Sequence, residues 1–126
     1  MRFLIVDDSA TMRRILLNSL QRIGFTDCVE AEDGREALDR FDASISCVIT
    51  DWNMPIMSGI EFVRALRGRA NGKTVPVLMV TTRSVREDTG AAVEAGANDY
   101  IMKPFTPQLL KEKIDQVMAS AAAPAH

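Results

Sequence analysis

The chain has 126 residues, a length that suits one domain, because a second hydrophobic core would have too little sequence to form. Hydrophobic residues make up 47% of it and charged residues 25%, with 7 glycines and 5 prolines, which excludes a disordered, collagen-like or disulfide-scaffold protein. The formal net charge of −2 excludes the basic footprint of a protein that binds nucleic acid or anionic membranes.

Five short apolar runs rich in β-branched residues each predict a strand. The expected strands are residues 2–6, 27–31, 47–50, 75–80 and 99–102. After each strand, apolar residues recur with the period of a helix, most weakly in the fourth case. The expected helices centre on residues 12–23, 37–41, 60–66, 85–95 and 109–117. Gly24, Gly68 and Gly96 lie just past three of these helices, where a left-handed residue commonly ends a helix.

Strict alternation of strands and helices predicts a parallel sheet with helices on both faces, because each parallel strand needs a right-handed crossover. We therefore expect a three-layer, doubly wound α/β fold. With five strands, the flavodoxin-like order 2-1-3-4-5 is favoured over a Rossmann sheet. In that order Cys28 and Cys47 lie on strands separated by the first strand, so we expect no disulfide and two small core residues.

The cellular compartment is inferred from the absence of a membrane span, a signal peptide and paired cysteines in this sequence. No run approaches the roughly 18 apolar residues of a membrane span, and the run after Met1 is too short for a signal peptide. The cysteines form no CxxC pair, which fits a reducing compartment. We expect a cytoplasmic protein with residues 1–118 as its domain and residues 119–126 as a disordered tail, since Pro124 and the missing apolar stripe argue against a longer helix.

Polar side chains follow four of the five expected strands, and the carboxyl ends of parallel strands meet at one edge of the sheet. They are Asp7 and Asp8 after the first strand, Asp51 after the third, Thr81 and Thr82 after the fourth, and Lys103 after the fifth. A single acid here would be explained as a helix cap, whereas three acids in a partly desolvated crevice recruit a cation or shift their pKa values. Oxygen ligands without His or Cys favour Mg²⁺.

A carboxylate beside a divalent ion, a hydroxyl and an ammonium is the arrangement that phosphoryl transfer needs. Asp51 is the candidate nucleophile, because carboxylates can form aspartyl phosphates. Lys103 could also be an ordinary solvated surface lysine. The turn at Pro104 favours instead a side chain held toward the sheet edge, above all if the Lys103–Pro104 peptide is cis. For Trp52 we expect a packing role with a half-exposed edge.

These motifs resemble those of the receiver domain of two-component response regulators, and most of all the single-domain, CheY-like chemotaxis regulators. The resemblance extends from about residue 2 to residue 118, with the motifs in order after the expected strands. They are Asp7-Asp8, Asp51-Trp52-Asn53-Met54-Pro55 with Gly59, Val80-Thr81, and Tyr100 followed by Met102-Lys103-Pro104-Phe105.

The resemblance implies that Asp51 accepts a phosphoryl group from a phosphohistidine of a histidine kinase. It implies Mg²⁺ held by Asp8, Asp51 and the backbone carbonyl of Asn53, with Asp7 acting through water. The protein would be a monomeric signalling protein rather than an enzyme, and it would assist its own phosphorylation and dephosphorylation. Its output would be binding to another protein, the flagellar motor switch in the chemotaxis case, with no nucleic-acid or membrane partner.

By the same resemblance Thr81 and Lys103 contact the phosphate, and Thr81 and Tyr100 act as the switch. Alternatively, Tyr100 is an aromatic strand residue at the edge of the sheet with no role in a switch. Thr82 and Arg83 depart from the pattern, in which a small residue and often an acid follow Thr81. Thr82 is expected to narrow access to the acceptor, and Arg83 either steers anions or is a solvated charge.

The Met12-Arg13-Arg14 segment is interpreted as a solvated helix face or a kinase-docking surface. Three rival functions remain to be weighed. A phosphatase with an aspartyl-phosphate intermediate needs a second acid where Asn53 stands, and a cap domain that excludes water. A nucleotide or flavin binder needs the glycines that residues 7–11 lack. A phosphate sink, or a regulator outside motility, remains an open alternative.

Overall fold

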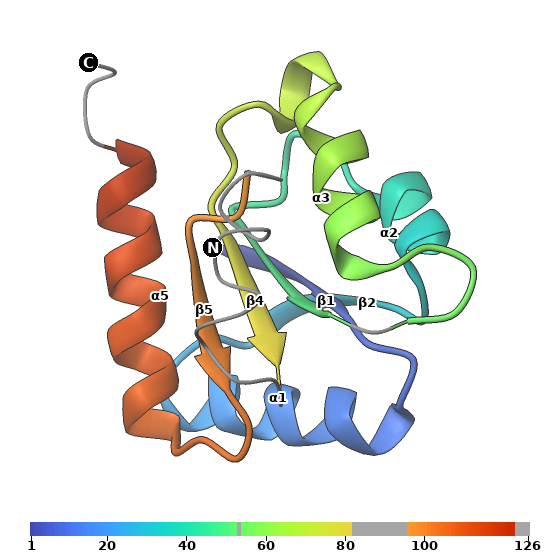
Figure 1. Cartoon of the computed structure of the whole chain (residues 1–126). Helices are drawn as coiled ribbons and strands as arrows, with labels where there is room; N and C mark the ends of the chain where they lie inside the picture. Colours follow the sequence, from blue (N-terminus) through green and yellow to red (C-terminus); the bar gives the residue numbers. More distant parts are fainter. Residues whose placement is uncertain (53, 82–95, 123–126) are drawn as a thin grey trace.

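Five parallel strands form one sheet in the order β2-β1-β3-β4-β5, which confirms the flavodoxin-like order expected for five strands (Figure 1). The computed structural model describes residues 1–52, 54–81 and 96–122. The strands are β1 (Arg2–Val6), β2 (Asp27–Ala31), β3 (Cys47–Asp51), β4 (Val77–Thr81) and β5 (Asp99–Met102). β4 begins two residues later than expected, because Pro76 has no N–H to donate to a strand ladder.

The helices begin where side chains can cap them. They are α1 (Ala10–Arg22), α2 (Gly34–Arg40), α3 (Gly59–Arg67), the short 3₁₀ helix η1 (Ala70–Gly72) and α5 (Pro107–Ala122). Ser9, Asp33 and Ser58 each accept a hydrogen bond from the backbone N–H three residues later, which satisfies a donor that the helix leaves unpaired. The helix expected at residues 85–95 lies outside the described residues. None of the helices in the described part of the chain has the length and hydropathy that crossing a membrane requires.

Two apolar clusters fill the space on either side of the sheet and make the fold three layers thick. Helices α2 and α3 cover one face, and α1 and α5 cover the other (Figure 1). Cys47 is fully buried and Cys28 is half-buried, and both thiols are free, as expected. Burial raises the pKa of the Cys47 thiol to about 12, so it behaves as a small apolar residue.

Two expectations about helix ends are wrong. Gly24 and Gly96 have left-handed φ values of 99° and 112°, but Gly68 has a right-handed φ of −73°. The chain continues past Gly68 with another turn, in which the Arg69 N–H donates to the Leu66 carbonyl, so it needs no left-handed reversal there. The helix expected to end near residue 118 continues to Ala122, because an alanine-rich end is helical without an apolar stripe.

The end of α3 is tied to the start of β5 by one side chain. The Arg67 guanidinium donates to the Gly96 carbonyl at 2.8 and 3.0 Å and to the Asn98 Oδ1 at 3.0 Å. It also donates to the carbonyls of Gly72 and Val75 at 2.9 and 2.7 Å. Because one arginine satisfies acceptors on three backbone segments, the entry to β5 has a set position relative to β4.

Candidate functional site

Three carboxylates meet at the carboxyl edge of the sheet. Asp7, Asp8 and Asp51 each offer an oxygen, and these oxygens all lie within 4.8 Å of one another. β1 and β3 are parallel neighbours, which brings the residues that follow or end them to the same place. The Asp7 N–H donates to the Ala31 carbonyl at 3.1 Å, so Asp7 continues the line of β1 although the strand ends at Val6. The structure thus gathers the three acids that the strand-edge argument singles out.

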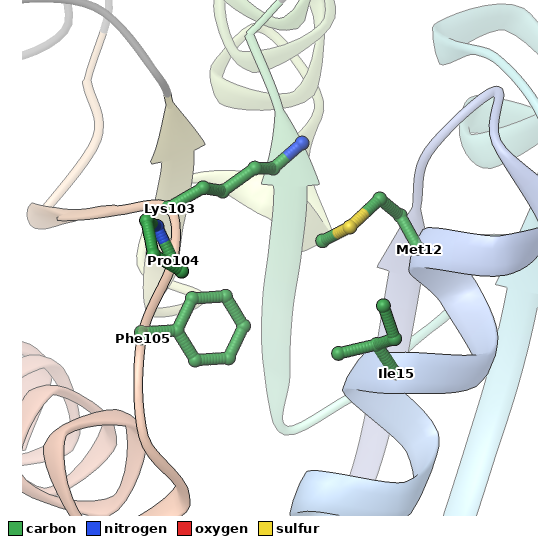
Figure 2. A pocket seen from close by; sticks show the side chains of 5 residues that line it. All are labelled: Met12, Ile15, Lys103, Pro104 and Phe105. Carbon is green, nitrogen blue, oxygen red and sulfur yellow. The ribbon is translucent and has the colours of Figure 1, made fainter.

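Lys103 reaches into this group of acids. Its Nζ lies 3.3 Å from the Asp51 Oδ1 and 3.6 Å from the Asp7 Oδ2. Figure 2 shows the side chain extending from the loop after β5 toward the end of β3. The Lys103 N–H donates to the Thr81 carbonyl at 2.8 Å, and the Lys103–Pro104 peptide is cis. Lys103 is therefore not a solvated surface lysine, since its side chain is only 17% exposed.

The Asp7 carboxylate is the most enclosed of the three acids, with 0% exposure. Its pKa is raised above the ordinary value, mainly by burial and also by the neighbouring charges of Asp51 and Asp8. The Ser9 N–H, 2.8 Å from its Oδ1, and the Lys103 ammonium act in the opposite direction. Its Oδ2 is buried and accepts no hydrogen bond from the described residues. An ionised carboxylate with a buried oxygen that accepts no hydrogen bond is a group that a bound cation stabilises.

The donor set fits Mg²⁺. All three candidate ligands are carboxylates, the hard oxygen donors that Mg²⁺ prefers, and Asp8 is exposed enough to leave the ion open to water and to a phosphoryl group. The proposed carbonyl ligand, at Asn53, lies outside the described residues, so its part in the site stays a prediction.

The raised pKa of Asp7 predicts how stability changes with pH. A buried acid with a raised pKa imposes no penalty while it is protonated, and destabilises the fold as pH rises from the ordinary value of 3.8 through the raised one. We expect the stabilisation by Mg²⁺, measured by thermal unfolding, to be larger at about pH 7.5 than at about pH 4. The Asp7→Asn variant should show a smaller pH dependence, with the remainder due to Asp8 and Asp51. An Mg²⁺ effect that is equal at both pH values in the native sequence would contradict the placement.

Thr81 and Tyr100 lie on β4 and β5, the next two strands of the sheet. Thr81 ends β4, directly after Val80, which pairs with Asp51 across the sheet, and it is buried. Tyr100 lies on β5 and is half-buried against the core under α2 and α3, with the Lys113 Nζ 5.4 Å from the centre of its ring. The roles of both residues in a switch stay predictions. Thr82 and Arg83 lie outside the described residues, and so do the predictions made for them.

The loop after β3 departs from expectation at Trp52. Its side chain is 6% exposed and packs in the core under α2 and α3, so the predicted half-exposed edge is wrong. The Trp52 N–H continues the pairing of β3 with β4 by donating to the Val80 carbonyl at 3.2 Å, and the loop then returns to Trp52, whose carbonyl accepts from the Gly59 N–H at 2.9 Å. At Gly59 an added Cβ would lie 2.2 Å from the Asp51 carbonyl oxygen. A glycine that looks like an ordinary turn residue therefore sets the approach of α3 to Asp51.

The same loop contains a strained residue. The Met57 N–H donates to the Pro55 carbonyl at 2.7 Å, which closes a γ-turn around Ile56 with its φ of 70°. A left-handed conformation costs a residue with a Cβ about 1–2 kcal/mol. The Ile56 side chain is 76% exposed, so removing it loses little burial.

We expect Ile56→Gly to raise the free energy of unfolding by up to about 1 kcal/mol, because glycine has no Cβ to clash at the positive φ of this γ-turn. Urea unfolding measures the change. Ile56→Asn should gain less, since asparagine tolerates the left-handed helical region rather than a γ-turn. A glycine variant less stable than the native sequence would show that the turn is not strained.

An apolar groove flanks the charged edge. It has a volume of about 320 Å³ and lies between α1 and the loop after β5 (Figure 2). Its walls are Met12, Ile15, Lys103, Pro104 and Phe105. A partner that reaches Asp51 from this side would bury apolar surface next to Lys103.

Arg13 was missed by the sequence reasoning. The interpretation of residues 12–14 as a solvated face is wrong for this residue, because its side chain is 12% exposed and contacts the ends of β1 and β2. Its Nη1 donates to the Asp7 carbonyl at 2.6 Å and its Nε donates to the Glu30 Oε1 at 3.1 Å. Only its position six residues after Asp7, on a helix that starts beside the sheet edge, pointed to such a contact.

Residues 3–115 match the response regulator receiver domain. The chain is 47% identical over 122 residues to "Chemotaxis protein CheY1" of Helicobacter pylori, covering 95% of this chain and 98% of the relative. It is 48% identical over 118 residues to "Chemotaxis protein CheY" of Pseudomonas aeruginosa, covering 93% and 95%. The solved structure of the chemotaxis response regulator CheY4 of Vibrio cholerae superposes with a TM-score of 0.83 at 37% identity, covering 92% of this chain and 97% of that one.

Proposed function

Because this chain belongs to the response regulator receiver domain family of two-component signalling, we propose that Asp51 is its phosphoacceptor. One observation carries the proposal: the Asp51 carboxylate lies among two further acids and 3.3 Å from the Lys103 ammonium at the carboxyl edge of the sheet. That edge is where parallel α/β sheets bind ligands and perform chemistry.

The reaction proposed is transfer from a phosphohistidine on a histidine kinase. An Asp51 carboxylate oxygen attacks phosphorus, the O–P bond forms as the P–N bond breaks, and the released imidazole takes up a proton. The Lys103 ammonium neutralises charge on the phosphoryl oxygens, and the Thr81 hydroxyl donates a hydrogen bond to one of them. These groups give the protein its part in its own phosphorylation, although it acts on no separate substrate.

Mg²⁺ is the cofactor of this proposal. It would be held by Asp8, Asp51 and the Asn53 carbonyl, with Asp7 acting through water. When bound, the ion supplies positive charge to the phosphoryl oxygens in the transition state. The Lys103 ammonium, which lies near both Asp7 and Asp51, offsets the repulsion between these two carboxylates.

The output proposed is binding to a downstream protein in chemotaxis, with the flagellar motor switch as the partner, by a cytoplasmic monomer. Its support is that curated relatives at 46–48% identity, covering nearly the whole chain, are named chemotaxis proteins. Thr81 and Tyr100 would carry the change from Asp51 to the partner surface. New contacts to the phosphoryl group bias an element that has two arrangements.

Incubation with Mg²⁺ and a small acyl phosphate, followed by intact mass measurement, tests the proposal. We expect one added phosphoryl group that hydroxylamine removes, that EDTA prevents, and that peptide mapping places on Asp51. A label that resists hydroxylamine or maps elsewhere would refute the assignment. Binding of a flagellar switch peptide before and after labelling then tests the output, and no gain in affinity would favour a phosphate sink.

A further inference from the structure

Arg13 joins three pieces of the chain beside the acidic edge. From α1, its guanidinium donates to the Asp7 carbonyl at 2.6 Å and to the Glu30 Oε1 at 3.1 Å. A second carboxylate, of Glu32, lies 4.0 Å from its Nη2. The fork of an arginine can hold two acceptors at once, and here it spans the end of β1 and the end of β2.

The hydrogen bond from Arg13 to the Asp7 carbonyl falls on the peptide bond that fixes the positions of two of the proposed metal ligands. The Asp7 carbonyl belongs to the peptide bond between Asp7 and Asp8, the two adjacent acids of the site. The other side of Asp7 is already held, because its N–H donates to the Ala31 carbonyl of β2 at 3.1 Å. A donor on the carbonyl therefore limits rotation of the remaining backbone bonds that aim the Asp8 carboxylate.

We propose that Arg13 is a positioning residue for Mg²⁺: braced on Glu30, it holds the Asp7–Asp8 peptide so that both carboxylates face the ion. The inference rests on the proposed function of these acids. Groups that hold metal ligands in place through hydrogen bonds commonly contribute 10- to 100-fold in metal affinity. The Arg13 brace acts through the backbone carbonyl rather than through a carboxylate, and so leaves all ligand oxygens free.

Charge and positioning predict opposite signs for the loss of Arg13. By Coulomb's law, removing a positive charge beside an acidic site strengthens cation binding. Removing a brace on the ligands weakens it. A weaker Mg²⁺ complex in a variant that has lost a positive charge can therefore not be a charge effect.

The test measures Mg²⁺ dissociation constants by titration calorimetry without any phosphodonor. Arg13→Gln removes both the charge and the fork, whereas Arg13→Lys keeps the charge but has one nitrogen for two acceptors. Arg14→Gln is the matched control, because it removes the same charge from the adjacent, exposed position of the same helix. Thermal unfolding with and without Mg²⁺ on each variant provides the second measurement and verifies that each is folded.

We expect Arg13→Gln to raise the dissociation constant about 10-fold or more. Arg13→Lys should fall between it and the native sequence, and Arg14→Gln should bind as tightly as the native sequence or slightly more tightly. With an acyl phosphate, the Mg²⁺ concentration for half-maximal labelling should rise in Arg13→Gln, while the rate at saturating Mg²⁺ changes little. A purely structural role would lower stability and leave the dissociation constant unchanged.

The positioning role of Arg13 would be refuted if Arg13→Gln bound Mg²⁺ as tightly as the native sequence, or if Arg14→Gln lost as much Mg²⁺ affinity as Arg13→Gln. Measurements on the native protein distinguish this result from a failure of the proposed function. If it binds Mg²⁺ and is labelled on Asp51 while Arg13→Gln binds equally well, only the brace is wrong. If the native protein binds no Mg²⁺, both are wrong.

Discussion

Asp51→Asn is expected to take up no phosphoryl group under conditions that label the native sequence completely. An amide oxygen is a poor nucleophile at phosphorus, whereas the carboxylate is the acceptor in our assignment. Asparagine preserves the size of the side chain and an Oδ1 that can accept from the Trp52 N–H, a contact of 2.9 Å in the native protein. The fold should therefore survive, which near-ultraviolet circular dichroism and intact mass together establish.

Asp8→Asn separates the nucleophile from a metal ligand. This variant keeps Asp51 and removes one exposed carboxylate from the group. We expect it to be labelled to the same extent as the native sequence at saturating Mg²⁺, with at least about a 10-fold rise in the Mg²⁺ concentration required. If Asp51→Asn were labelled at the native rate, the assignment of Asp51 as the acceptor would be wrong, regardless of the labelling of Asp8→Asn.

Gly59→Ala is expected to damage both the fold and the site. Its Cβ would lie 2.2 Å from the Asp51 carbonyl oxygen and 3.1 Å from the Trp52 Cα, and backbone atoms cannot turn aside as a flexible side chain can. We expect the free energy of unfolding to fall by roughly 3 kcal/mol, at the upper end of overpacking effects. Because the clash displaces the residue that carries the acceptor, labelling should slow by about 100-fold, the effect of a misplacement near 1 Å. Urea unfolding and the rate of mass increase measure the two effects.

Gly68→Ala is the matched control at the other end of α3. Gly68 has an ordinary right-handed φ of −73°, and the nearest atom to an added Cβ lies 3.3 Å away. Its stability should stay within about 1 kcal/mol of the native value, and its labelling rate should be unchanged. If Gly59→Ala behaved like Gly68→Ala, the close approach of α3 to Asp51 would not matter to either fold or chemistry.

The strand order and the acidic edge were predictable because they follow from pattern and topology. Alternating strands and helices predict parallel pairing, and the five-strand order makes β1 and β3 neighbours, so that Asp7, Asp8 and Asp51 follow or end adjacent strands at one edge. The position of Lys103 was predictable for the same reason, since it follows the neighbouring edge strand.

What the sequence did not reveal is the direction in which individual side chains turn. Arg13 is charged and lies beside an exposed arginine, and only the meeting of α1 with the ends of β1 and β2 shows that it points inward. The burial of Trp52 depends on how the loop after it returns to Gly59 and on the packing of α2 and α3 over the sheet. Both outcomes are decided by contacts between distant segments, which a local pattern does not contain. The right-handed backbone at Gly68 depends instead on the short turn that follows α3.

The buried carboxylate of Asp7 also matters for anyone who evolves this protein in the laboratory. A library sorted for heat resistance alone, in buffer without divalent ions, would enrich neutral residues at position 7, since they remove an ionised group from the interior. By our proposal, the most heat-resistant clones would then no longer signal. Adding Mg²⁺ to the selection buffer should reverse this preference, because a bound ion would stabilise the ionised Asp7 carboxylate.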